Sequence, residues 1–405
     1  MAAFGGWSVR VRTFSERLGG WPRSPRRNLH KKKWASSRRR VRGARLALQS
    51  LDMSCGPQFG DLWPSIRVGL LCEQKFGALL NGFGDVERAI GQMELQQARD
   101  FVYDGRNESS GRGLNTEESP PHCSDPSPFG GNSGRESLET KPYLSVSPNL
   151  KCFTFPRGDT TRFNPARLGS LKLLEYYLMD AASLLPVLVL DVRPGHTVLD
   201  LCAAPGGKTL ALLQTECCRH LVVNDISISR LSRLRKILHS YVPKNFCTED
   251  RLRITSFDGR LWGEIEKDTF DRVLVDAPCT TDRHSVLEDD NNIFSQMRLR
   301  ERRMLPLIQT QLLVSGILAA KPGGSIVYST CSLSHLQNEH VVERAVQVAE
   351  MEHGMELRLE DLTAVRTLYR ETFNFYGDCR VGELVLPHLT ANYGPMYFCK
   401  LNKVH

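Results

Sequence analysis

Two cysteines in this chain follow apolar, strand-like runs and stand among polar residues. Cys279 lies in DAPCTT, residues 276–281, and Cys331 lies in YSTCSLSHLQNE, residues 328–339. A thiol can act as a nucleophile, because its thiolate forms a covalent bond to an electrophilic carbon. A cysteine is more often a small buried apolar side chain. The end of a parallel strand favours the chemical role, since α/β enzymes keep their reactive groups there.

A second stretch, VLDLCAAPGGKT at residues 198–209, predicts a buried strand that runs into a glycine-rich turn and then a helix. Gly206 and Gly207 permit backbone conformations and close contacts that a side chain would prevent. The helix that follows presents free N–H groups to an anionic ligand. The stretch therefore predicts a small-ligand site, within which Cys202 is expected only to pack.

The spacing in this turn argues against two common ligands. A P-loop requires glycine five residues before Gly207, and Cys202 stands there. A dinucleotide fingerprint requires GxGxxG, which CAAPGGK does not supply. S-adenosylmethionine remains as the third common ligand of such a turn. Its ribose diol would bind an acid at the end of the next strand. Asp225 stands at that position, and Asp258 follows the third strand, where a contact to the adenine edge is expected, although each acid alone is more often a helix cap.

An alternation of strands and helices from Leu150 onward must position these residues. Strands are expected at 197–201, 221–225, 253–257, 272–276 and 325–330, and helices at 168–190, 302–321 and 333–351. Three late extended segments, 356–362, 382–386 and 396–401, predict a closing antiparallel edge. The pattern indicates a doubly wound α/β sheet, with the acids Asp200, Asp225, Asp258 and Asp276 at one edge.

The turn after the fourth predicted strand distinguishes between methylation of an amine and methylation of a carbon atom. Enzymes that methylate an exocyclic amine typically carry an Asn/Asp-Pro-Pro-aromatic turn, whereas residues 276–279 read Asp-Ala-Pro-Cys. Carbon 5 of cytosine is a poor nucleophile, so a thiolate must first add to carbon 6, and a base then removes the carbon-5 proton. Asp276 is placed to donate to ring N3 during the addition. Nucleobase N-methylation stays an alternative, which would make the cysteines dispensable.

In this order and spacing, VLDLCAAPGGKT, DAPC and STCS resemble the motifs of the Sun-domain, RsmB-type RNA cytosine-C5 methyltransferases, from about Leu150 to the C-terminus. Four longer segments resemble the family members that act on mitochondrial small-subunit rRNA: DAPCTTDRHS, NNIF, STCSLSHLQNE and NYGPMYFCK. The resemblance implies a Rossmann-like class I methyltransferase fold and S-adenosylmethionine as the cofactor. It also implies that Cys331 is the nucleophile and that Cys279 assists product release.

By the same resemblance, eight residues are expected at or near the cofactor: Gly206, Gly207, Lys208, Asp225, Arg230, Asp258, Gly259 and Asp276. Lys208 and Arg230 have the alternative interpretation of ordinary charges on helix surfaces. One departure concerns the DAPC loop, since most relatives continue DAPCSG and this chain continues Thr-Thr-Asp-Arg-His at 280–284. The loop beside the target base is therefore expected to differ in shape.

Charge is distributed unevenly along the 405 residues, whose net charge is +8. Residues 1–45 contain fourteen Arg and Lys and one acid, so residues 46–405 hold 39 basic and 44 acidic residues. A nearly acid-free, Arg-rich N-terminus is typical of a mitochondrial transit peptide and predicts the matrix as location. A nuclear-localisation or RNA-binding arm is the competing interpretation.

Four regions are expected: a transit peptide at 1–45, a helical segment at 46–103, a flexible linker at 104–148 that is rich in Ser, Gly and Pro, and the methyltransferase domain at 149–405. The twelve cysteines form no CxxC pair or zinc spacing, so no metal is expected. No apolar run reaches the ~18 residues that span a bilayer, so no membrane association is expected.

The net-acidic body carries no recognisable RNA-binding module, although basic residues at 230–236 and 298–303 are candidates for phosphate contacts. The resemblance implies mitochondrial small-subunit rRNA and ribosomal subunits as partners. It also implies a helical-repeat protein of the mitochondrial transcription termination factor family, which would supply RNA affinity. A non-catalytic ribosome-assembly factor that retains the fold is the alternative to an enzyme.

Overall fold

The computed structural model describes residues 42–104 and 147–404. These residues belong to one compact unit, Val41–His405. The predicted transit peptide, 1–45, and the predicted linker, 104–148, lie outside the described residues except at their ends. Both therefore stay predictions, as do the domain boundaries.

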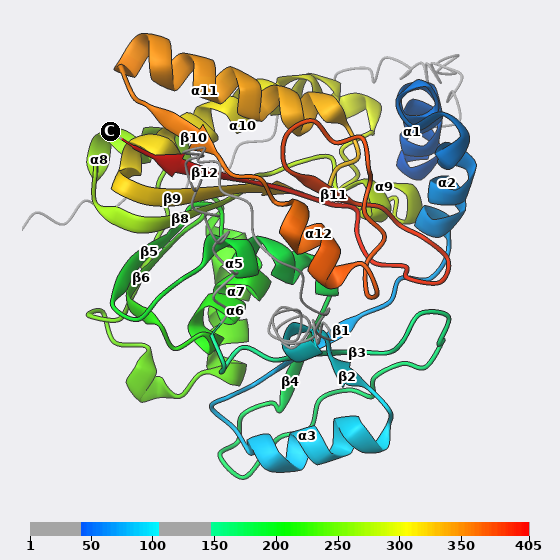
Figure 1. Ribbon diagram of the computed structural model, residues 1–405, viewed down its shortest axis with the longest axis vertical. Helices are drawn as coiled ribbons and strands as arrows, with labels where there is room; N and C mark the ends of the chain where they lie inside the picture. The colour runs from blue at the N-terminus through cyan, green and yellow to red at the C-terminus, as the bar shows by residue number, and fades with distance from the viewer. Residues whose placement is uncertain (1–41, 105–146, 405) are drawn as a thin grey trace, which may run out of the picture. The chain divides into compact units, whose positions relative to one another are not determined.

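A large mixed sheet forms the centre of this unit (Figure 1). Its parallel strands are β5 (His196–Asp200), β6 (Cys218–Asn224), β7 (Leu252–Thr255), β8 (Phe270–Asp276) and β9 (Ala320–Thr330). The antiparallel strands are β10 (Leu357–Leu359), β11 (Glu383–Val385) and β12 (Met396–Lys403). The order is β10-β12-β9-β8-β5-β6-β7, with β11 paired to β12. The predicted doubly wound sheet with a closing antiparallel edge is confirmed.

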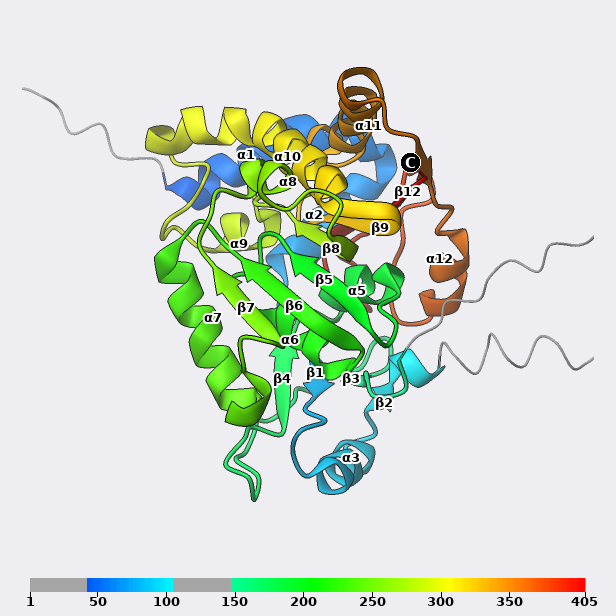
Figure 2. The ribbon, with the colours of Figure 1, turned by 90° about the vertical axis from the view of Figure 1, so that its left-hand side faces the viewer.

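Helices cover both faces of this sheet, as Figures 1 and 2 show. One face carries α5 (Leu185–Leu190), α6 (Gly207–Gln214), α7 (Ile228–Tyr241) and α12 (Thr363–Tyr369), and the other carries α8 (Trp262–Ile265), α10 (Leu299–Ala319) and α11 (Glu339–His353). Successive strand residues point to opposite faces of the sheet. Val198 therefore packs in the apolar cluster under α5, α6 and α7, and Leu199 packs in the cluster under α8, α10 and α11. The apolar runs of the parallel strands arise because both faces are buried.

Short 3₁₀ turns complete the unit at Gly60–Leu62, Ala181–Leu184, Lys244–Phe246, Gly259–Leu261, Gln296–Arg298 and His335–Gln337. The predicted helix at 333–351 begins later than expected, at Glu339. The reason is that Ser332 and Leu333 bond to the Asp282 side chain instead of entering a helix.

The N-terminal segment contains strands as well as the predicted helices. It comprises α1 (Gly43–Phe59), α2 (Trp63–Leu71), β1 (Gly77–Leu80), α3 (Val86–Leu95) and β2 (Arg99–Asp100). In a four-stranded sheet of order β2-β3-β1-β4, both strands join β3 (Cys152–Thr154) and β4 (Tyr176–Met179). The wholly helical interpretation of 46–103 is therefore corrected, because β1 pairs with strands that lie far along the chain.

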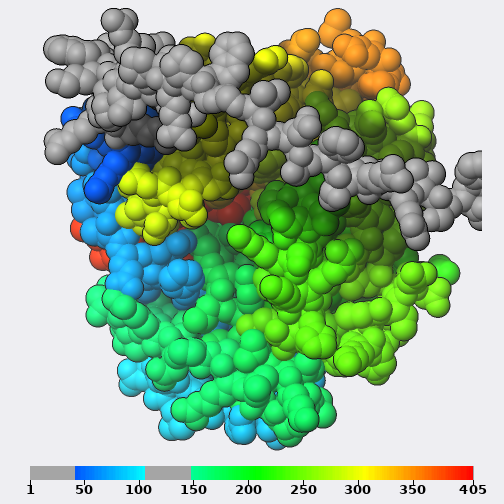
Figure 3. Space-filling view, turned by 180° about the vertical axis from the view of Figure 1, so that it is seen from behind, coloured from blue at the N-terminus to red at the C-terminus, as the bar shows by residue number. Residues whose placement is uncertain are grey.

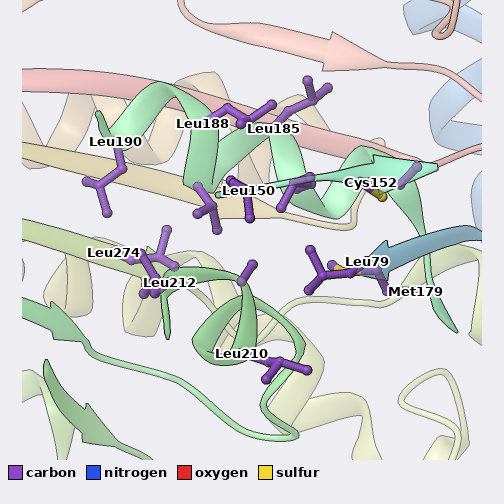
Figure 4. Packing of buried hydrophobic residues seen from close by; sticks show 14 of the residues in the cluster. Leu79, Leu150, Cys152, Met179, Leu185, Leu188, Leu190, Leu210, Leu212 and Leu274 are labelled. Atoms are coloured by element: carbon purple, nitrogen blue, oxygen red, sulfur yellow. The ribbon is translucent and has the colours of Figure 1, made fainter. Parts of the chain in front are cut away.

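The amphipathic helix predicted at 168–190 is wrong. Residues 176–179 form β4, and α5 begins only at Leu185, with Pro186 in its first turn. Every residue of α5 is buried. The apolar residues of this stretch therefore reflect complete burial and not the single apolar face of an amphipathic helix. Figure 4 shows Leu185, Leu188 and Leu190 packed with side chains from α6 and the small sheet.

The first two helices pack against the short helix α9 (Asp282–Leu287) and the loop that follows it. The backbone N–H of Ala44 donates to Asp289 (3.0 Å), and Figure 3 shows the start of α1 beside the residues after α9. The buried Arg283 guanidinium bonds to the carbonyl oxygens of Gly69 and Gly394. The N-terminal segment thus supports the loop that carries Cys279.

Candidate active site

The strand order reverses beside β5, which has β6 on one side and β8 on the other. The chain runs from β5 outward to β6 and β7 and then returns to β8. In open α/β sheets, ligands bind at the carboxyl ends of the strands at such a reversal. The glycine-rich turn and the DAPC loop follow the two strands that flank this point, β5 and β8.

Gly206 caps the N-terminus of α6 in a conformation that requires glycine. Its φ is +118°, and a Cβ atom there would lie 3.3 Å from Cγ of Leu234. A Cβ on Gly207 would lie 3.3 Å from Cε1 of Tyr177. Leu234 and Tyr177 therefore pack closely against the turn. The first backbone N–H groups of α6 have no partner within the helix.

Asp200 ends β5 and is completely buried. The hydroxyl of Thr209 donates to its Oδ2 (2.6 Å), while Oδ1 has no hydrogen-bond partner among the described residues. Burial raises the pKa of this carboxyl to about 7. Asp200 was expected only as a strand-end acid, and the structure places it under the glycine turn.

Asp225 follows β6 and is tied to the same turn. Its carboxylate accepts hydrogen bonds from the backbone N–H groups of Ala204 (3.2 Å) and Ser227 (2.9 Å). Arg230 forms an ion pair with it (3.1 Å) and also bonds to the carbonyl oxygen of Ala204. Arg230 is thus held at the turn by Asp225, which argues against the interpretation as an ordinary surface charge.

Asp258 and Gly259 stand three and four residues after β7. Asp258 pairs with Arg260 (2.6 Å), and this hydrogen-bonded pair lowers the pKa of its carboxyl. A Cβ on Gly259 would lie 2.8 Å from Leu312 and 3.3 Å from Leu201, so glycine permits close packing beneath the site. The four predicted acids lie at the carboxyl ends of their strands, as expected.

Lys208 links the glycine-rich turn to the end of β8. Its Nζ lies 2.9 Å from Oδ2 of Asp276, and Ser329 donates to Oδ1 of the same carboxylate (2.8 Å). Burial disfavours the charged ammonium, but the charge of Asp276 and the hydrogen bond to it together raise the pKa of Lys208. Lys208 is therefore a buried charged partner of Asp276 and not a solvated helix charge.

Cys279 and Cys331 face each other, with their Sγ atoms 3.2 Å apart. The hydrogen bond to Cys279 and burial raise the pKa of the Cys331 thiol well above its ordinary value, and Lys208 opposes this shift. Cys202 lies partly buried against the apolar cluster of α10 and α11, as expected. The structure thus brings Cys279, Cys331 and Asp276 to adjacent strand ends.

Sequence reasoning missed a buried polar network behind these cysteines, formed by Thr280, Asp282, Gln309, Ser332 and Gln337. It ties the loop after Cys279 to the loop after Cys331. The departure from DAPCSG at 280–281 was the signal that could have identified it.

The residues present fit S-adenosylmethionine. The N–H groups at the start of α6 suit its carboxylate, and Asp225 retains acceptor capacity for a ribose hydroxyl because each of its oxygens carries two lone pairs. The unpartnered Oδ1 of Asp200 is a further acceptor below the turn. Within the described ranges, neither a group of metal-ligating side chains nor a helix able to cross a membrane is found.

Comparison with known proteins gives relatives along most of the chain. The family described as 16S rRNA methyltransferase RsmB/F matches residues 187–402. The 5-cytosine rRNA methyltransferase NSUN4 of Bos taurus is 57% identical over 93% of this chain and 94% of its own length. A mitochondrial tRNA (cytosine(34)-C(5))-methyltransferase of Danio rerio is 41% identical over 63% of this chain and 68% of its own length. The crystal structure of NSun6 from Pyrococcus horikoshii with SFG shares the fold, with TM-score 0.54 and 17% identity over 89% of this chain and 98% of that one.

Proposed function

The chain belongs to the 16S rRNA methyltransferase RsmB/F family, and from this premise we propose that it methylates carbon 5 of a cytosine in mitochondrial small-subunit rRNA through a covalent adduct with Cys331. It is an S-adenosylmethionine-dependent cytosine-5 RNA methyltransferase. The observation that carries the covalent mechanism is the 3.2 Å contact between the Sγ atoms of Cys279 and Cys331, beside the Lys208–Asp276 ion pair.

In the proposed reaction, the cofactor supplies an electrophilic methyl group, and the protein activates the base. The Cys331 sulfur bonds to carbon 6 of cytosine, and the double bond between carbons 5 and 6 gives way to one between carbons 4 and 5. The thiol proton passes through Asp276 to ring N3, and carbon 5 becomes electron-rich. Asp276 stabilises this addition at ring N3, and its carboxylate is fixed on both sides by Lys208 and Ser329. Carbon 5 then accepts the methyl group as the bond from that group to the sulfonium sulfur breaks, and S-adenosylhomocysteine is the leaving group.

Release of the product reverses the addition. The carbon-5 proton leaves to a base, the double bond between carbons 5 and 6 re-forms, and the bond from carbon 6 to sulfur breaks. Cys279 assists this elimination, since its Sγ stands in contact with that of Cys331. The remaining proposed site residues, Gly206, Gly207, Asp225, Arg230, Asp258 and Gly259, bind the cofactor.

The proposed location is the mitochondrial matrix, and ribosomal subunits are proposed partners. The Arg-rich N-terminus and the names of the relatives support a mitochondrial role. Residues 46–405 are net acidic, which supports a separate partner for RNA affinity, proposed as a helical-repeat protein of the mitochondrial transcription termination factor family. The target base must be extruded or single-stranded, so incompletely assembled rRNA is the proposed substrate.

The test uses the full chain, with and without the partner, labelled S-adenosylmethionine, and two RNAs, mitochondrial small-subunit rRNA and mitochondrial tRNA. We expect carbon-5 methylation of the rRNA, loss of methylation in Cys331→Ala, and accumulation of a protein–RNA adduct in Cys279→Ala. Full activity of Cys331→Ala would exclude the covalent mechanism. Methylation of the tRNA alone would exclude the rRNA substrate.

The same experiment distinguishes the proposed enzyme from a protein that assists ribosome assembly without catalysis. For such a protein, neither the wild type nor Cys331→Ala would transfer label. The two forms would support subunit assembly in cells equally well. The proposal expects label transfer by the wild type.

A further inference from the structure

The carboxylate of Asp282 is buried between the two loops that carry the cysteines. Its side chain is 0% exposed. Oδ1 accepts a hydrogen bond from the Thr280 hydroxyl (2.5 Å), and Oδ2 accepts from the Ser332 hydroxyl (3.1 Å) and the Leu333 backbone N–H (2.7 Å). Both oxygens are therefore engaged, one with each loop.

These partners adjoin the reactive residues directly. Thr280 follows Cys279, and Ser332 follows Cys331 in the chain. The backbone N–H of Asp282 also donates to the carbonyl oxygen of Cys331 (3.3 Å). A shift of the Asp282 carboxylate would therefore move the backbone that directly follows each cysteine.

Gln337 closes the network from the other side. Its Oε1 accepts from the backbone N–H of Thr280 (3.1 Å), and its Nε2 donates to the hydroxyls of Thr280 (2.9 Å) and Ser332 (3.1 Å). Gln309 donates to Oε1 of Gln337 (3.2 Å) and to the carbonyl oxygen of Pro278 (2.8 Å). The amides thus hold the same two loops, while Asp282 is the one charged group of this five-residue network.

An ionised carboxylate suits three donors because it only accepts hydrogen bonds. In an isosteric amide, the oxygen can still accept from Ser332 and Leu333. Its NH2 group would then face the Thr280 hydroxyl, which could no longer donate to residue 282 and would have to turn its proton towards Ser332. A buried carboxylate is costly, and burial raises the pKa of Asp282 while its three hydrogen bonds oppose that shift. The arrangement is therefore matched to the charged form of this residue.

We propose that Asp282 is a positioning residue that holds the Cys279 and Cys331 loops at their contact distance. It acts through Thr280, Ser332 and Leu333 and touches neither substrate nor cofactor. The effect on methylation rests on the proposed function, whereas the effect on the distance between the two sulfur atoms does not.

The experiment compares full-length wild type with Asp282→Asn. One measurement is the rate at which diamide links Cys279 to Cys331, read by mass spectrometry of the joined peptides. In this reaction the two thiols lose two protons and two electrons to the N=N bond of diamide and form one S–S bond. The other measurement is methylation of the rRNA, with kcat and the KM for S-adenosylmethionine determined separately.

Glu383→Gln is the matched control. Glu383 is 2% exposed, pairs with Arg366 (2.9 Å), and lies in β11, which β12 separates from β9. Its neutralisation reports the general consequence of removing a buried carboxylate charge. We expect it to leave the disulfide rate and kcat close to wild type.

For Asp282→Asn we expect the disulfide rate to fall at least tenfold and kcat to fall on the order of 100-fold, since a misplacement of about 1 Å can cost that much. The KM for S-adenosylmethionine should change little. An unchanged disulfide rate would overturn the inference, as would equal losses in Asp282→Asn and Glu383→Gln.

If Asp282→Asn does not fold, Thr280→Val and Ser332→Ala replace it, since each removes one donor to the carboxylate and leaves the charge in place. We expect intermediate losses of disulfide rate, and wild-type rates in both variants would overturn the inference. Should the wild type methylate none of the RNAs, the proposed function fails, and the disulfide rates still decide whether Asp282 positions the cysteines.

Discussion

The Sγ atoms of Cys279 and Cys331 lie 3.2 Å apart, although the residues are separated by 52 positions in the chain. The contact arises because β8 and β9 are adjacent parallel strands in which Asp276 pairs with Ser329. Cys279 stands three residues after the end of β8, and Cys331 directly follows β9. This contact, together with burial, raises the pKa of the Cys331 thiol.

The first prediction concerns this ionisation. Contact with Cys279 is the main cause of the raised pKa of Cys331. Cys279→Ala should therefore lower that pKa, so that iodoacetamide alkylates Cys331 severalfold faster near neutral pH. The measurement is peptide mass spectrometry over a pH series, with substitution of the exposed Cys247 by Ala as control. An unchanged or higher midpoint would contradict the prediction.

The second prediction concerns the Lys208–Asp276 ion pair. Asp276→Asn should lower methylation about 100-fold or more, in the range of a lost acid–base group. It should also lower the free energy of unfolding by roughly 3 kcal/mol, because the buried Lys208 loses its partner.

Adding Lys208→Met to Asp276→Asn provides the control for this pair. The double variant should recover stability in urea unfolding, since no unpaired charge stays buried, but should not recover activity. A full recovery of activity would show that Asp276 contributes only through the ion pair.

The third prediction concerns stability and pH. Burial raises the pKa of Asp200 to about 7 in the folded protein, above its value of about 3.9 in the unfolded chain. The stabilisation is therefore fully present below about pH 4 and is lost as pH rises through about 7. Asp200→Asn should remove a decrease of roughly 2 kcal/mol between about pH 5.5 and 8.5.

Urea unfolding without added cofactor measures this effect, and substitution of the exposed Asp61 by Asn is the control. Identical pH profiles for wild type and Asp200→Asn would show that Asp200 does not titrate in this range.

The fourth prediction concerns the glycine turn. Gly206→Ala should destabilise the protein by about 1–3 kcal/mol, since a side chain at φ +118° is strained, and should weaken S-adenosylmethionine binding as the turn shifts away from Leu234. Gly195→Ala is the matched control, because φ there is +91° with no atom within 4 Å of the added Cβ. It should cost stability alone. Equal cofactor affinity of wild type and Gly206→Ala in calorimetry would refute the prediction.

The sequence alone predicted the parallel strands, the glycine turn after β5 and the positions of Asp276, Cys279 and Cys331 at strand ends. These features depend on neighbours within a few residues. A short apolar run bounded by turn residues is buried on both faces, and the residue after it stands at a sheet edge. Parallel order then brings Asp276 and Ser329 together.

Only the tertiary structure decided the remaining features. Residues 176–179 became a strand, and not a helix, because β1 supplies a partner almost one hundred residues earlier. Asp282 became a bridge between two loops because β8 and β9 are adjacent, which places Ser332 and Leu333 beside it. Apolar periodicity records how deeply a residue is buried, whereas pairing partners and buried hydrogen bonds are fixed by residues distant in the chain, and no local pattern encodes them.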